Sequence, residues 1–251
     1  MPTERAEKII LFLKSHAIAT VEQLVKVTGS SPATIRRDLV KMSDEGTILR
    51  THGGVSLNQF IAYQPTTNEK AARQIAEKER ITDYAASLIT AGSSVLLDAG
   101  TTTLMIARKI AHIPLRVITT DLHIALFLSE YKQIEVTITG GRIDHSSQSC
   151  IGAFGQNVLE RVYPDFAFVS CNSWDLNAGV TAPTEEKAHL KKTLSGAAKQ
   201  RFLVADSSKY GKYSLYAVAP LNHFSAIVTD NVLLPEAQVE LKANGIQLEL
   251  V

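Results

Sequence analysis

The stretch TVEQLVKVTGSSPATIRRDLVKM, residues 20–42, decides the fold of the first part of the chain. Thr20 and Gln23 have the spacing of a capping box, in which two side chains bond to free amides at the start of a helix. Gly29 is placed to end that helix, and Ser31, followed by proline, is placed to begin the next one. Two short helices joined by a glycine turn predict a helix-turn-helix motif.

The second of these helices has two distinct faces. At 100° per residue, Ile35, Leu39 and Met42 share one face, which we expect to be buried. Arg37 points almost directly away from that face, so it is expected to reach a guanine edge in the major groove of DNA. Asp38 would repel phosphate, and we expect it to pair within the domain. The helix and its start contribute these expected DNA-binding residues: Ser31, Ala33, Thr34, Arg36, Arg37 and Lys41, with Thr34, Arg36 and Lys41 directed at phosphates.

A hairpin is predicted directly after this helix. Strand-like runs at residues 47–50 and 55–57 flank a glycine bend. Such a hairpin is a wing, and Arg50, His52 and Gly53 are expected to contact the backbone or the minor groove of DNA. The alternative is an ordinary solvated helix face, because paired arginines occur on many protein surfaces. Residues 1–56 hold eight Lys or Arg against six acids, an excess too small to decide between the two.

Length and composition indicate a globular protein. A chain of 251 residues with 45% hydrophobic and 20% charged residues can form one small and one medium domain. It has no apolar run of the roughly 18 residues that a membrane helix needs, and its start does not resemble a secretory signal. Cys150 and Cys171 have neither disulfide nor metal-ligand spacing. We therefore expect a cytoplasmic protein with no metal site, no membrane partner and no resident cofactor.

The rest of the chain predicts an α/β domain. Residues 1–57 form the expected DNA-binding domain, residues 58–69 the linker and residues 70–251 the larger domain, which opens with a helix over about residues 69–90. Short apolar runs then alternate with helical segments, as in a doubly wound parallel sheet. The strands are expected at residues 94–97, 116–119, 135–139, 166–170, 202–205 and 226–229. Trp174 is expected in the core rather than in a pocket wall.

The loops that follow these strands predict an anion site, because ligands bind beyond the carboxyl ends of such strands. The first loop, Asp98 to Thr103, offers hydroxyls and the free amides of a helix N-terminus. The expected effector-binding residues are Asp98, Gly100, Thr101, Thr102, Thr103, Thr120, Asp121, Gly140, Gly141, Arg142, Asp206 and Lys209. The two basic residues would hold a phosphate and the aspartates sugar hydroxyls. Each loop also has a structural explanation, as a helix cap, a Gly-Gly turn or a solvated charge. No Walker motif or GxGxxG is present, which disfavours ATP and dinucleotides.

Several of these motifs resemble those of DeoR-type transcriptional regulators. They are SPATIRRDL at residues 31–39, EGTILRTHGG at residues 45–54, DAGTTT at residues 98–103 and DSSKYG at residues 206–211. The resemblance implies a winged helix-turn-helix followed by a sensor domain related in fold to ribose-5-phosphate isomerase. It also implies a repressor of a carbohydrate-utilisation operon that a phosphorylated sugar or related metabolite releases from operator DNA. Thr120-Asp121, in place of the usual threonine-asparagine, and the bulky segment Ser170–Leu176 depart from the family pattern.

Two other functions fit part of the sequence. One is a sugar-phosphate isomerase or deaminase with a DNA-binding appendage, which needs a general base. Asp98, Asp121 and Asp206 are available for that role, but no pattern indicates a raised pKa. The other is an activator or nucleoid-type protein without a ligand, which leaves the glycine loops without a purpose. We expect a regulator with no catalytic residues, and repeated half-sites favour a homo-oligomer, either a dimer or a tetramer.

Overall fold

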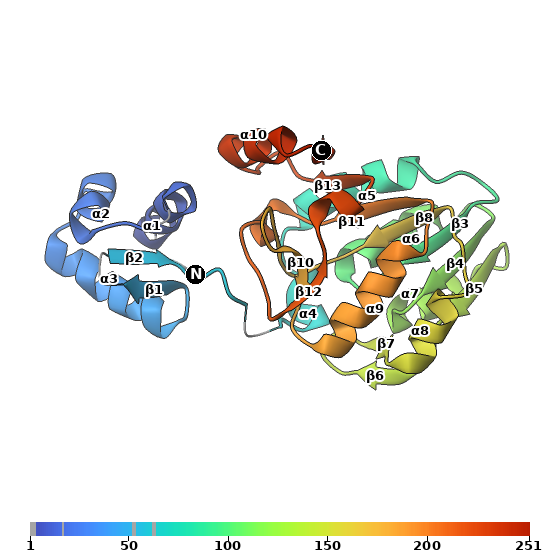
Figure 1. Ribbon diagram of the computed structural model, residues 1–251. Coiled ribbons are helices and arrows are strands. Elements are labelled where there is room, and N and C mark those ends of the chain that lie inside the picture. Colours follow the sequence, from blue (N-terminus) through green and yellow to red (C-terminus); the bar gives the residue numbers. More distant parts are fainter. Residues whose placement is uncertain (1–3, 17, 52–53, 62–63) are drawn as a thin grey trace. The chain divides into compact units, whose positions relative to one another are not determined.

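The computed structural model describes residues 4–16, 18–51, 54–61 and 64–251 (Figure 1). It divides the chain into two compact units, Met1–Phe60 and Ile61–Val251. None of the helices in the described ranges combines the length and the apolar character needed to span a bilayer.

The N-terminal unit is a winged helix-turn-helix. Its elements are α1 (Glu4–Ser15), α2 (Val21–Thr28), α3 (Pro32–Asp44), β1 (Ile48–Thr51) and β2 (Gly54–Leu57). The capping box of Thr20 and Gln23 is present, and Gly29 ends α2 in the left-handed region at φ 68°. The predicted helix-turn-helix and hairpin are therefore confirmed.

One apolar core holds this unit together. Ile9, Leu24 and Ile35, one from each helix, are fully buried in it. β1 and β2 pair antiparallel, and Ala19 exchanges two backbone hydrogen bonds with Val55 at 2.8 and 2.9 Å. Because of this close approach, a Cβ at Gly54 would lie 2.3 Å from the Ala19 carbonyl oxygen. Glycine is therefore required where the wing meets the helices.

The larger unit is built on a seven-stranded parallel sheet of order β14-β13-β11-β8-β3-β4-β5 (Figure 1). Its strands are β3 (Ser94–Leu97), β4 (Leu115–Thr119), β5 (Ile134–Ile138), β8 (Phe166–Val169), β11 (Gln200–Val204), β13 (Ala226–Thr229) and β14 (Leu248–Leu250). The main helices are α5 (Ile75–Ser87), α6 (Thr101–Ile110), α7 (Leu122–Leu128), α8 (Ala153–Leu159), α9 (Glu185–Gly196) and α10 (Pro235–Ala243).

Helices cover both faces of this sheet. One apolar cluster joins residues of α5, α6 and α7 to one face of the strands, and a second joins α8, α9 and α10 to the other face. Alternate residues of a strand enter different clusters: Val95 and Leu97 of β3 pack in one, and Leu96 packs in the other. The predicted doubly wound α/β domain is confirmed, with β14 as an additional edge strand.

The predicted helix over residues 69–90 is wrong in one respect, because it is broken. A short helix, α4 (Thr67–Ala71), precedes α5, and Gln74 between them has a left-handed φ of 51°. The buried ammonium of Lys78 donates to the carbonyls of Lys70 and Arg73, the latter at 2.6 Å. The Lys70 carbonyl also accepts from the Arg73 amide at 3.2 Å, a bond over three residues that ends α4, and the Lys78 side chain supplies a further donor to each carbonyl.

Two small antiparallel sheets were not predicted. β9 (Trp174–Asp175), β10 (Gly179–Ala182) and β12 (Tyr216–Ala219) form one, and β6 (Arg142–Asp144) pairs with β7 (Ser149–Ile151) in the other. Their strands have only two to four residues, too few for alternation to show in the sequence. Trp174 is fully buried and lies 4.7 Å from Tyr210, ring centre to ring centre, which confirms its place in the core.

Candidate functional site

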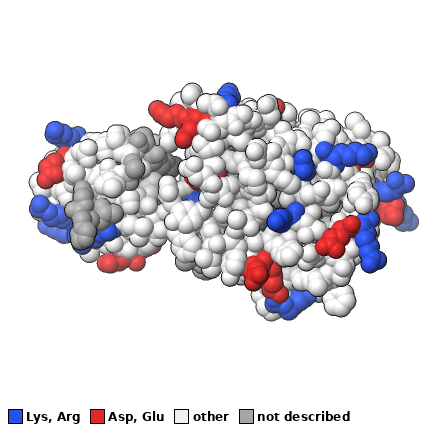
Figure 2. All heavy atoms as spheres, viewed as in Figure 1, with Lys and Arg blue, Asp and Glu red and all other residues white. Residues whose placement is uncertain are grey.

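The outer face of α3 carries three exposed basic side chains. Arg36, Arg37 and Lys41 all reach solvent, while the apolar residues of the same helix are buried. Lys41 lies 3.8 Å from Glu45 in an exposed ion pair, which is worth little in water. Figure 2 shows Lys and Arg atoms gathered at the left of this unit with acidic atoms nearby. The basic residues are therefore free to meet a polyanion without unfolding any part of the core.

The start of α3 is held by local hydrogen bonds. The Ser31 hydroxyl accepts from the Thr34 amide at 3.2 Å, and the two hydroxyls lie 2.9 Å apart. Ala33 is exposed beside them. Arg5 of α1 holds Asp38 in an ion pair, with Nη2 donating to Oδ1 at 3.1 Å. The prediction that Asp38 pairs within the domain is confirmed, and this pair ties α3 to α1.

The structure describes one of the three expected DNA-binding residues of the wing. Arg50 is exposed on β1, opposite Val55 of β2. His52 and Gly53 lie outside the described residues.

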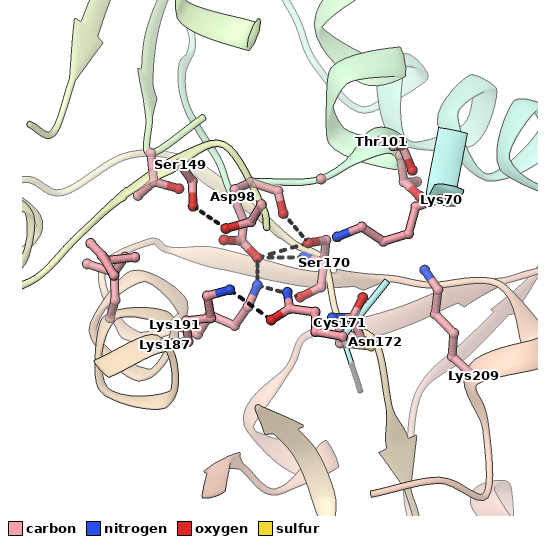
Figure 3. A pocket seen from close by; sticks show the side chains of 18 residues that line it. Lys70, Asp98, Thr101, Ser149, Ser170, Cys171, Asn172, Lys187, Lys191 and Lys209 are labelled. Carbon is pink, nitrogen blue, oxygen red and sulfur yellow. Dashed lines mark hydrogen bonds and ion pairs between the residues drawn. The ribbon is translucent and has the colours of Figure 1, made fainter. Parts of the chain in front are cut away.

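A cavity lies at the carboxyl ends of the central strands of the larger unit (Figure 3). Six of the expected residues line it: Asp98, Gly100, Thr101, Thr102, Thr120 and Lys209. They follow β3, β4 and β11, so the sheet brings together loops that are distant in sequence.

The N-terminus of α6 forms one wall. A Cβ at Gly100 would lie 2.8 Å from the Ser170 hydroxyl, so a larger residue there would displace the Ser170 side chain, which follows β8. Among the described residues, no acceptor is found for the amides of Thr101, Thr102 and Thr103, which begin the helix. Free amides and the helix dipole both favour an anion there.

The neighbouring expected residues shape this loop without lining the cavity. Asp121 caps α7 by accepting from the His123 amide at 2.7 Å, and it also accepts from the Gly100 amide at 3.1 Å. Burial raises the pKa of Asp121, and these hydrogen bonds oppose the rise. The Thr103 hydroxyl donates to the Gly100 carbonyl at 2.9 Å. These contacts hold the loop in one conformation.

The Gly140–Arg142 loop lies elsewhere. None of its residues lines the cavity; Arg142 is exposed and forms an ion pair with Glu186. A Cβ at Gly141 would lie 2.5 Å from the Ile151 carbonyl oxygen, so this glycine permits the β6–β7 pairing. The structure therefore gives the Gly-Gly turn a packing role and places Arg142 on the surface.

Four lysines line the cavity: Lys70, Lys187, Lys191 and Lys209. Lys191 forms an ion pair with Asp98 and donates to the Ser170 carbonyl at 2.9 Å. Lys187 lies 2.8 Å from Asp144, and Lys209 lies 3.2 Å from Asp206, which is itself buried beside the cavity. Each of these three lysines has one carboxylate partner, which holds its side chain in place.

Lys70 differs from the other three. No hydrogen bond or ion pair of its ammonium group is found within the described ranges, and Figure 3 shows the side chain reaching towards Ser170. Burial, followed by the charges of Lys191, Lys209 and Lys187, lowers its pKa to about 8, against the attraction of Asp98. Lys70 is therefore a cation surrounded by cations, and an incoming anion would stabilise all four.

A hydroxyl without a partner points to the same ligand. Thr120 lines the cavity and is fully buried, and its Oγ1 has no hydrogen-bond partner among the described residues. A buried polar atom left unpaired costs about 1–3 kcal/mol. Ser147, Ser149 and Asn172 add further polar groups to the lining. The cavity can therefore bind an anion and several hydroxyls at once.

Sequence reasoning did not find three of the lysines. Lys70 lies on α4, and Lys187 and Lys191 lie one helical turn apart on α9, so none follows a strand. In the stretch EEKAHLKK, residues 185–192, they resemble a solvated helix face. Their spacing of four residues was the available signal, because it places both on one side of the helix. Among the described residues, no group of His, Cys, Asp or Glu could hold a metal ion.

Comparison with known families settles the kind of protein. Residues 5–60 match the DeoR-like helix-turn-helix domain, and residues 73–231 match the DeoR C-terminal sensor domain. The chain belongs to the DeoR family of transcriptional regulators. An uncharacterised HTH-type transcriptional regulator of Haemophilus influenzae is 36% identical over 252 residues, covering 100% of this chain and 98% of the relative.

Other relatives of this DeoR-family regulator are repressors by name. The lactose phosphotransferase system repressor of Streptococcus mutans is 34% identical over 231 residues, covering 90% of this chain and 91% of the relative. Ribose 5-phosphate isomerase A of Methanocaldococcus jannaschii matches 53% of each chain at 15% identity and a TM-score of 0.39. Full-length agreement with regulators makes this protein a regulator rather than an isomerase or a deaminase.

Proposed function

We propose that the protein represses a carbohydrate-utilisation operon and leaves its operator when a phosphorylated sugar or related metabolite binds the larger unit. The observation that carries the proposal is Lys70, an unpaired cation in a cavity that three other lysines and a helix N-terminus line. A phosphate has the charge and the acceptor oxygens to meet these groups.

The same cavity has groups suited to a sugar. Hydroxyls both donate and accept, so they match the side chains of Ser147, Ser149 and Asn172 and the unpartnered Thr120 hydroxyl. No resident cofactor enters the proposal, because the effector itself is the ligand. The lactose phosphotransferase system repressor of Streptococcus mutans, a relative by sequence, supports a link to sugar supply.

The N-terminal unit would read the operator. Arg37 would contact base edges, and Arg36, Lys41 and Arg50 would contact phosphates. A dimer or tetramer in the cytoplasm would place several α3 helices on repeated half-sites. The effector would release the protein by binding its DNA-incompetent arrangement more tightly, and a coupling of about 1–3 kcal/mol changes DNA affinity some 5–150-fold.

The test uses the full-length protein and a DNA fragment selected by it from a random library. Phosphorylated sugars are added singly, and release is followed by fluorescence anisotropy at constant salt. We expect at least one to release the wild-type protein and none to release Lys70→Met at the same concentration, although that variant still binds DNA. Lys242→Met, which removes an exposed charge on α10, is the control and should respond normally. Failure of every phosphorylated sugar to release the wild type would overturn the proposal, and normal release of Lys70→Met would remove Lys70 from the binding site.

A further inference from the structure

A second cavity adjoins the first. The two share Lys70, Thr101, Asn172 and Lys209 in their linings. In Figure 3, Lys70 and Lys209 lie on the same side of the site, away from Lys187 and Lys191. A single elongated ligand can therefore occupy both cavities at once and lie along the Lys70 and Lys209 side chains.

The second cavity is strongly basic. Arg73, Lys78 and Lys212 line it in addition to the shared lysines, and Asp206 is the one acidic side chain that the described residues contribute to its lining. Asp206 already pairs with Lys209 at 3.2 Å. The Arg73 guanidinium has no carboxylate partner within the described ranges. Among the described residues, its lining therefore holds more cationic than acidic side chains.

The break between α4 and α5 builds the second cavity. Gln74, with its left-handed backbone, turns the chain so that the N-terminus of the 13-residue α5 lies at the lining. The Lys78 ammonium, which is buried, donates to the carbonyls of Lys70 and Arg73 and so fixes the two residues that carry the neighbouring cationic side chains. Burial, followed by the charge of Lys209, lowers the pKa of Lys78 to about 8, against the attraction of Asp206.

Charge balance then limits the ligand. Besides Lys212, the described residues contribute six cationic side chains to the two linings, and three carboxylates pair with them or lie in the linings: Asp98, Asp144 and Asp206. The excess is larger than the charge of about −1.5 to −2 that a single phosphate brings at pH 7. A second anionic group on the same ligand would complete the balance.

We propose that the effector is a phosphorylated sugar with a second anionic group, either another phosphate or a carboxylate, which binds in the second cavity against Arg73 and Lys209. This inference rests on the proposed function and narrows its ligand class. The first phosphate occupies the α6 N-terminus beside Lys70, and the sugar hydroxyls face the polar residues between the two ends.

The test compares three probes by isothermal titration calorimetry on the full-length protein: fructose 1,6-bisphosphate, 6-phosphogluconate and glucose 6-phosphate. Fructose 1,6-bisphosphate and 6-phosphogluconate have an anionic group at each end, and we expect at least one of them to bind at least tenfold more tightly than the monophosphate. The tighter of the two identifies the second anionic group. Arg73→Gln, a change at an exposed position, should weaken that probe about tenfold or more and leave the monophosphate within about twofold. Lys242→Gln is the matched control.

Two results would overturn this inference while leaving the proposed function intact. One is a monophosphate affinity equal to that of both probes with two anionic groups. The other is an equal loss of affinity for all three probes in Arg73→Gln. If no phosphorylated compound in a wider panel binds or releases DNA, the proposed function itself fails.

Discussion

The outer face of α3 and the cavity of the larger unit both present positive charge, but in opposite surroundings. Arg36, Arg37 and Lys41 stand in water, where salt screens them and their solvation is nearly complete. Lys187 and Lys191 have side chains only 7% and 17% exposed, and each is held by a carboxylate. Folding desolvates the first set very little, whereas burying the charges of the second set without their carboxylate partners would cost folding free energy.

This difference reflects the two ligands. DNA is a dense polyanion whose counterions are released on binding, so exposed and mobile cations suffice. A small anion offers few contacts, so the cations must already be positioned and partly dehydrated before it arrives. Changes on α3 should therefore alter binding alone, and changes in the cavity should alter binding and stability together.

The largest expected effect concerns Asp98. In Asp98→Ala, Lys191 loses its partner while its side chain remains largely buried. We expect the free energy of unfolding of the larger unit to fall by about 3 kcal/mol, as for other buried pairs broken on one side. Urea unfolding of the full-length protein measures this. Asp83→Ala, which breaks an exposed pair with Lys109, is the control and should cost about 0–1 kcal/mol. Equal losses of unfolding free energy in the two variants would contradict the inferred difference between buried and exposed ion pairs.

The next effect concerns Arg37. Arg37→Ala should weaken binding to the selected operator by about 1–3 kcal/mol and change non-specific binding much less, because a base contact is lost. Lys41→Ala should weaken both about equally, because it removes a phosphate contact. Anisotropy titrations with operator and scrambled DNA at one salt concentration distinguish the two. If Arg37→Ala loses the same affinity for operator and scrambled DNA, Arg37 contacts a phosphate and not a base.

The smallest effect is a pH dependence set by Lys70. Its pKa is lowered from 10.5 to about 8 in the folded protein, and a bound anion favours the protonated form. Affinity for the phosphorylated effector should therefore fall above pH 8, by at most about tenfold per pH unit. The phosphate does not titrate in this range, because its second pKa is about 6. Calorimetry between pH 7 and 9.5 should show this slope in the wild type.

Stability should respond to pH in the opposite direction. Between pH 8 and 10.5 the unfolded chain still binds the Lys70 proton that the folded protein has released, so the Lys70 contribution to stability rises with pH there. Lys70→Met should lack this contribution and show a smaller affinity slope, because Lys78, whose pKa is also about 8, lines the adjoining cavity. An unchanged affinity slope in Lys70→Met would assign the titration to another group.

The sequence by itself determined the elements that depend on local chemistry. The capping box at Thr20, the glycine stop at Gly29 and the buried stripe of α3 all follow from spacing along one helix. The strands of the parallel sheet follow from short apolar runs, since a strand buried on both faces needs no alternation. The same rules placed the Asp98–Thr103 loop at the edge of the sheet, where six expected residues line the cavity.

Only the tertiary structure decided which charges meet. Lys70 lies on α4, and Lys187 and Lys191 lie on α9; apart from the four-residue spacing of the last two, their neighbours along the chain do not distinguish them from solvated lysines. The break at Gln74 likewise depends on Lys78 reaching back to the carbonyls of Lys70 and Arg73. The helical period shows which face of a helix a residue occupies. Packing decides what that face contacts, and therefore also the burial and pKa of the residue and the number of cations around the ligand.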